Sequence, residues 1–136
     1  MEVSPMSGPL VFVSHSKVKP GKLEAYQAQA ADATDLVESE EPRMIAFNFY
    51  ASDDRADVAT VQVHPDAESL DLHMKIFFDK LREKAFATLD TDEINVYGAP
   101  SDATLEMLSQ MPSQFPGLRV RVLREHQGGF LRPQPL

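Results

Sequence analysis

The feature that most constrains this chain is a strand that runs directly into a capped helix. Residues 57–64 are rich in β-branched residues and contain no helix or strand breaker. Asp66 follows at once, in the position that caps a helix N-terminus, and a helical pattern continues to about residue 89. A second unit of the same kind comes earlier, because residues 10–18 predict a strand and residues 23–38 predict a helix. Two strand–helix units in about 100 residues indicate a small split β-α-β domain.

The remaining elements complete this order. Residues 44–50 predict a strand that forms a hairpin with the strand at 57–64. The second helix is expected to break near Phe78, because its pattern is long, and residues 91–97 predict the next strand. The predicted fold is therefore α+β, a ferredoxin-like β-α-β-β-α-β sandwich with an antiparallel sheet.

The length of 136 residues predicts one domain with short extensions. We expect a flexible leader at residues 1–9 and the ferredoxin-like domain at residues 10–110, which ends in a short helix. Prolines and glycine then predict a linker in the C-terminal segment, residues 111–136. Residues 118–124 in this segment alternate apolar and basic side chains, which is typical of an edge strand, and this strand is a candidate for exchange with a partner.

A homodimer is expected because both faces of the first strand are apolar. Val11 and Val13 share one face of the first strand, and Leu10 and Phe12 share the other, so both faces are apolar. A sheet with two apolar faces needs a second covering layer, and the sheet of a second copy is the simplest one.

Composition excludes several classes of function. The formal net charge is −8, with 21 acidic against 13 basic residues, which argues against a nucleic-acid partner. The absence of cysteine excludes disulfides, thiolate metal sites and a cysteine nucleophile. Neither a membrane-spanning apolar run nor a signal peptide is recognisable, so we expect no membrane contact and a cytoplasmic location.

His73 is the candidate catalytic residue. It lies between Leu70 and Phe77 on one apolar helical stripe, which predicts that its ring points inward. Imidazole exchanges protons near neutral pH, so a buried ring beside a pocket suits a general base. The alternative is a core histidine that is hydrogen-bonded to backbone.

Several segments together resemble a known family. They are residues 18–26, the aromatic second strand, residues 63–70 with His73, and the strand end at 95–98. Over residues 10–108 the chain resembles the antibiotic biosynthesis monooxygenase-type domain of the dimeric α/β barrel superfamily. The resemblance implies a pocket between helices and sheet. It leaves the reaction open, because the family includes cofactor-free oxygenases of phenols and quinols as well as haem-degrading enzymes.

The haem-degrading branch of this resemblance is disfavoured. Its pocket Asn, Trp and iron-ligating His correspond in order to Ser14, His73 and Glu83, and none of the three agrees. His15, His64 and His73 follow no metal-ligand spacing either. We therefore expect neither a metal site nor a cofactor.

The leading hypothesis is a cofactor-independent monooxygenase that acts on a small aromatic or quinol substrate. His73 is its proposed base, Ser14 and Asn48 are candidate polar contacts, and Tyr26 and Phe77 are candidate stacking walls. One alternative is a non-catalytic, small-molecule-binding or stress-response dimer. Another is an interaction protein whose own side chains fill the pocket.

Overall fold

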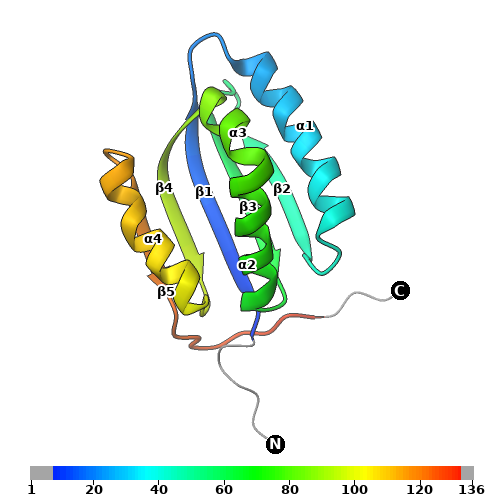
Figure 1. Cartoon of the computed structure of the whole chain (residues 1–136), viewed down its shortest axis with the longest axis vertical. Coiled ribbons are helices and arrows are strands. Elements are labelled where there is room, and N and C mark those ends of the chain that lie inside the picture. The colour runs from blue at the N-terminus through cyan, green and yellow to red at the C-terminus, as the bar shows by residue number, and fades with distance from the viewer. Residues whose placement is uncertain (1–7, 133–136) are drawn as a thin grey trace, which may run out of the picture.

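A computed structural model describes residues 8–132 and confirms the predicted ferredoxin-like order of elements (Figure 1). The leader predicted for residues 1–9 lies almost wholly outside the described residues. In chain order the elements are β1 (Leu10–Val18), α1 (Leu23–Glu40), β2 (Ala46–Ala51), β3 (Asp57–His64), α2 (Ala67–Ile76), the π-helical turn η2 (Phe77–Leu81), α3 (Arg82–Thr88), β4 (Leu89–Tyr97), α4 (Asp102–Gln114) and β5 (Arg119–Leu123).

The sheet has the strand order β2-β3-β1-β4-β5, with β1 in the centre. The pairs β1–β3, β1–β4 and β2–β3 are antiparallel, as predicted. One expectation about the sheet needs correction. β5 runs parallel to β4 of the same chain, so the sheet is mixed, and the exchange of this strand with a partner stays a prediction. The connection through α4 explains the parallel direction, because a helix returns the chain to the end of the sheet where β4 began.

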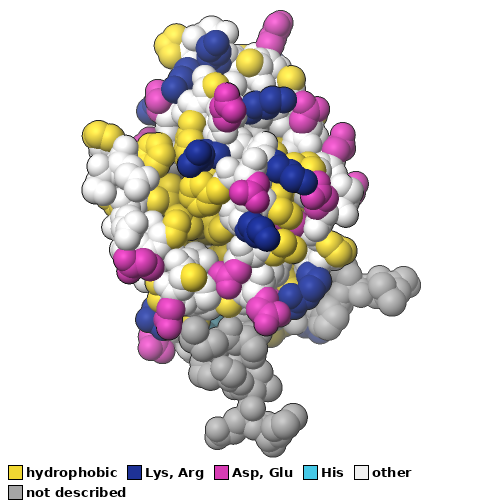
Figure 2. All heavy atoms as spheres, in the orientation of Figure 1, with side chains coloured by type: hydrophobic (Ala, Val, Ile, Leu, Met, Phe, Trp, Pro, Cys, Tyr) yellow, Lys and Arg dark blue, Asp and Glu magenta, His cyan; other side chains and the backbone are white. Residues whose placement is uncertain are grey.

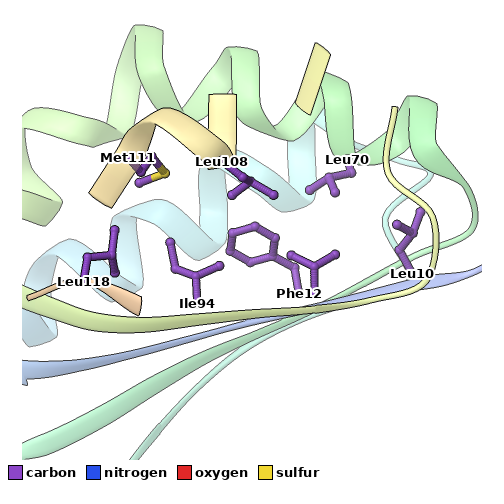
Figure 3. Packing of buried hydrophobic residues seen from close by; sticks show 8 residues of the cluster. Leu10, Phe12, Leu70, Ile94, Leu108, Met111 and Leu118 are labelled. Atoms are coloured by element: carbon purple, nitrogen blue, oxygen red, sulfur yellow. The ribbon is translucent and has the colours of Figure 1, made fainter. Parts of the chain in front are cut away.

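All the helices lie on one face of the sheet (Figure 1). Between them and the sheet lies the main hydrophobic cluster, in which Phe12 and Ile94 from the strands face Leu70 and Leu108 from the helices (Figure 3). Leu70 and Leu108 are almost fully buried. Two smaller clusters attach α1 to β2, β3 and β4. The core is therefore one layer thick.

The C-terminal helix is longer than predicted. α4 continues through Pro112 to Gln114, so the expected boundary at residues 110 and 111 falls inside it. Leu108 and Met111 are both buried in the main cluster, and this packing outweighs the backbone hydrogen bond that proline cannot make. No helix among the described residues has the length and apolar character to cross a bilayer.

No helix of residues 8–132 lies on the opposite face of the sheet (Figure 1). Val11, Val13 and Val61 lie there, half-buried, on neighbouring strands β1 and β3. Tyr50 and Tyr97 are respectively 59% and 45% exposed on β2 and β4. The centre of this face is apolar, and charged side chains such as Glu93 and Arg119 lie towards β5.

Candidate active site

A cavity of about 100 Å³ lies between the sheet and the helices. Strands β1, β2, β3 and β4 form its floor, and residues from every helix form its roof. Hydrophobic side chains gather between α4 and the α2–α3 segment (Figure 2). Six aromatic residues line the cavity: Phe12, Phe47, Phe49, Phe77, Phe78 and Phe86. Because the chain's own side chains leave this space open, the alternative of a filled pocket is not supported.

The helix cap and the apolar stripe together bring His73 to the cavity. Asp66 accepts a hydrogen bond from the backbone N–H of Ser69 at 3.0 Å, which fixes the start of α2. Leu70 and His73 then lie on the buried face of the helix, and His73 is only 1% exposed. The ring lines the cavity and packs at 5.5 Å, centroid to centroid, from the ring of Phe47.

A buried carboxylate holds the ring of His73. The Nδ1 atom lies 2.9 Å from Oε2 and 3.1 Å from Oε1 of Glu41, whose residue is 3% exposed. Glu41 caps the C-terminus of α1, where Pro42 prevents the helix from continuing. A carboxylate accepts hydrogen bonds, so Nδ1–H donates to it, and in the neutral ring the lone pair is then on Nε2. Among the described residues, Nε2 has no hydrogen-bond partner of its own.

A second histidine lies behind the first. His64, at the end of β3, is fully buried, with its ring centroid 5.9 Å from that of His73. Its Nδ1 lies 2.8 Å from the hydroxyl of Ser69, and its Nε2 lies 2.9 Å from Oε1 of Gln62. Burial, followed by the neighbouring His73, lowers the pKa of His64 to about 4, and Asp66 opposes this slightly. His64 is therefore neutral at pH 7 and acts as a structural hydrogen-bonding group.

The other predicted site residues divide into two groups. Ser14 and Phe77 line the cavity together with His73. Tyr26 is buried beside it, packed with Val58 and Leu89 in one of the smaller clusters, and does not line it. Asn48 is exposed, on the face of β2 that carries Tyr50 and not on the face that carries Phe47 and Phe49. The structure does not bring Asn48 to the cavity.

Polar residues that the sequence did not single out also line the cavity. Gln62, on β3, contributes its amide between the cavity and His64. Ser16 on β1 and Thr91 on β4 share a hydrogen bond of 2.9 Å between their hydroxyls. Gln29 reaches the cavity from α1. A strand period of two, counted from Ser14, would have grouped Ser16 with it, but no local pattern points to the others.

The described residues contain no cluster of side chains with the ligand number that a metal ion needs. Within residues 8–132 no group of three or more His, Asp or Glu side chains is placed to hold a metal ion. Glu83, at the position that corresponds to the haem ligand of the degrading enzymes, is exposed on α3 and does not line the cavity.

Comparisons with known proteins identify the fold. No model of a protein family matches the sequence, and no curated protein matches it significantly. Among solved structures, MupZ from Pseudomonas fluorescens is 19% identical, with a TM-score of 0.69, and the alignment covers 95% of this chain and 98% of MupZ.

Two further structures match the same domain less completely. SnoaB, a cofactor-independent oxygenase from Streptomyces nogalater, is 14% identical with a TM-score of 0.57, over 69% of this chain and 95% of SnoaB. A candidate antibiotic biosynthesis monooxygenase from Bacteroides thetaiotaomicron is 20% identical with a TM-score of 0.54, over 60% of this chain and 80% of that protein. The chain thus has the antibiotic biosynthesis monooxygenase-type fold, and the resemblance noted in the sequence is confirmed at the level of the fold.

Proposed function

We propose that the protein is a cofactor-independent monooxygenase that oxidises a small phenol or quinol in the cavity, with His73 as the general base. The observation that carries the proposal is the Glu41–His73 pair. A carboxylate on Nδ1 fixes the orientation and tautomer of the ring and stabilises the imidazolium that forms when Nε2 takes a proton. A merely structural histidine needs no buried carboxylate, which is costly to desolvate.

The chemistry requires little more than a base and a dry pocket. Nε2 of His73 removes the hydroxyl proton of the substrate, and the resulting anion is electron-rich enough to give one electron to dioxygen. The two radicals combine to form a carbon–oxygen bond. The O–O bond then breaks, one oxygen stays on carbon as a carbonyl, and the other leaves as water with the ring hydrogen and the proton held by His73. The substrate gains one oxygen and loses two hydrogens, and dioxygen supplies the oxidant.

The lining of the cavity supports this class of substrate. Phe47 and Phe77 stand on opposite sides, on the sheet and the helices, and offer faces and edges to a flat ring. Ser14 is the polar contact we assign on the floor. The fold shared with SnoaB, itself a cofactor-independent oxygenase, is consistent with the same reaction type here.

Oxygen consumption tests the proposal directly. The purified protein, treated with a chelator and supplied with no flavin, is presented with a panel of phenols and quinols in an oxygen electrode. We expect uptake with at least one compound and a loss of about 100-fold or more in His73→Gln, whose amide still faces Glu41 with a donor. His126→Gln, at an exposed histidine, is the matched control and should keep full activity. Uptake that is absent in the parent, or unchanged in His73→Gln, contradicts the proposal.

The proposed active unit is a homodimer through the open sheet face. The half-buried valines on β1 and β3 and the exposed tyrosines Tyr50 and Tyr97 form an apolar surface that none of the described helices covers. A second copy with the same surface removes it from water on both sides.

The second candidate is a carrier that binds a small apolar molecule without turnover. The largely aromatic cavity favours it, because such a lining retains an aromatic ligand whether or not a reaction follows. Binding of a panel compound without any oxygen uptake would select this candidate over the oxygenase.

A further inference from the structure

Gln29 lines the cavity from the inner face of α1 and is 8% exposed. Its Oε1 is buried and has no hydrogen-bond partner within residues 8–132. Buried polar atoms are nearly always paired, and leaving one unpaired destabilises the fold. A glutamine kept at this position therefore indicates a partner that enters the cavity from outside the chain.

A free hydroxyl proton lies on the same part of the cavity wall. Ser16 and Thr91 hydrogen-bond to each other, and only one of their two hydroxyl protons is used in that bond. Gln29 lies one helical turn along α1 from Tyr26, and Tyr26 packs on Val58 of β3. Val58 is in turn the residue of β3 that pairs with Ser16 of β1. The acceptor of Gln29 and the spare donor of the Ser16–Thr91 pair thus belong to one end of the cavity.

This polar end is separated from His73 along the sheet. His73 packs on Phe47 of β2. Phe47 pairs with Gln62 of β3, and Gln62 pairs with Phe12 of β1, so His73 lies over the part of β1 near Phe12. Ser16 is four residues further along β1 than Phe12, which is about 13 Å of strand. A single aromatic ring with two para substituents and a hydrogen bond at each end spans about 11 Å, which is comparable with this length of strand.

We infer that Gln29 determines specificity, by accepting a hydrogen bond from a second hydroxyl of the ligand, at the opposite end from the one that reaches His73. A hydroxyl is the group that fits, because it donates to Oε1 of Gln29 and accepts from the Ser16–Thr91 pair. The preferred ligand class is an aromatic compound with hydroxyls at both ends. The inference rests on the proposed function only in taking the cavity as the ligand site.

Binding under nitrogen separates this inference from the oxygenase proposal, because no turnover is needed. Calorimetry compares hydroquinone with para-methylphenol, in which a methyl group of similar size replaces one hydroxyl. The measured quantity is the ratio of the two dissociation constants in each protein, and the difference in ligand desolvation cancels when this ratio is compared between proteins. We expect Gln29→Met to lower the preference for hydroquinone about three- to tenfold relative to the parent. Gln27→Met, on the exposed face of the same helix, should leave it unchanged.

Two further readouts keep the result interpretable. Gln29→Met should melt at the same temperature as the parent or higher, because it removes an unsatisfied buried oxygen. Thr91→Val, which loses a hydroxyl and keeps the shape, should also lower the preference. If both ligands bind and the ratio is the same in the parent and Gln29→Met, the inference is wrong and the cavity remains a ligand site. If neither ligand binds to the parent, the inference fails, and the oxygen-uptake panel decides the proposed function separately.

Discussion

The hydrogen bond between Glu41 and His73 makes a prediction that a purely structural role does not. In Glu41→Gln the amide oxygen still accepts from Nδ1, but the negative charge that stabilises the imidazolium is lost. We expect kcat for the substrate found in the oxygen-uptake panel to fall about 10- to 100-fold, with little change in KM. Glu38→Gln, an exposed glutamate on the same helix, is the control and should change neither constant. A rise in KM alone would show that Glu41 shapes the pocket without assisting the base.

The buried His64 predicts how stability depends on pH. Its pKa in the folded protein is about 4, below its ordinary value of 6.5, so the unfolded chain binds a proton that the folded chain does not. The free energy of unfolding therefore falls as the pH drops below 6.5, by about 2 kcal/mol between pH 7 and pH 5, and this contribution stops changing below about pH 4. Urea denaturation at several pH values measures it. In His64→Gln the fall in the free energy of unfolding between pH 7 and pH 5 should be smaller by about 2 kcal/mol. An equal fall in parent and variant would contradict the burial of a neutral ring.

Single residues also mark the limit of what the sequence could predict about the site. The helical stripe placed His73 and Phe77 correctly on the inner face, because periodicity alone decides that. Glu41 could not be found this way, since its contact with His73 spans 32 positions and its place before a proline is typical of a solvated helix end. Asn48 does not line the cavity, although we predicted that it would. Its position in the strand groups it with the exposed Tyr50, but the apolar residues next to it in sequence favoured a buried amide.

At the scale of elements, the end of β4 depends on a glycine. Gly98 has φ +114, and a Cβ atom built there would lie 2.8 Å from the backbone oxygen of Pro9. We expect Gly98→Ala to lower the free energy of unfolding by about 2–4 kcal/mol, because a backbone clash adds to the strained φ. Gly21→Ala is the matched control, since Gly21 also has a positive φ of +75 and meets no atom within 4 Å. Its cost should be nearer 1 kcal/mol, and equal losses in urea denaturation would exclude the clash.

The elements themselves were mostly predictable, and the exceptions have physical causes. The expected break in the second helix is the π-helical turn at Phe77–Leu81, where the N–H of Arg82 bonds to the carbonyl of Phe77, five residues earlier. This turn brings Phe77, Phe78 and Leu81 to the cavity. α4 overran its predicted end because tertiary burial of Met111 overrides the local cost of a proline. The pairing of β5 depends on which sheet edge is vacant, and a local sequence pattern does not contain that information.

For the whole molecule, the open sheet face predicts an assembly of two chains. Size-exclusion chromatography with light scattering should give twice the mass of one chain for the parent. Val61→Asp places a charge at the centre of the apolar face and should give the mass of one chain. Leu72→Asp changes an exposed leucine on the helical side and should remain dimeric. A parent that is monomeric at all concentrations would contradict the dimer.

The central claim is that the imidazole of residue 73 takes a proton from a bound phenol, and ultraviolet absorption measures this without any turnover. A phenolate absorbs at longer wavelength than the neutral phenol, so a difference spectrum of protein plus ligand, recorded under nitrogen at pH 7, reports the ionised fraction of the bound ligand. The account predicts a phenolate band with the parent that is lost in His73→Gln while the ligand still binds. A bound ligand that stays neutral in the parent, or a phenolate band of equal size in His73→Gln, would contradict it.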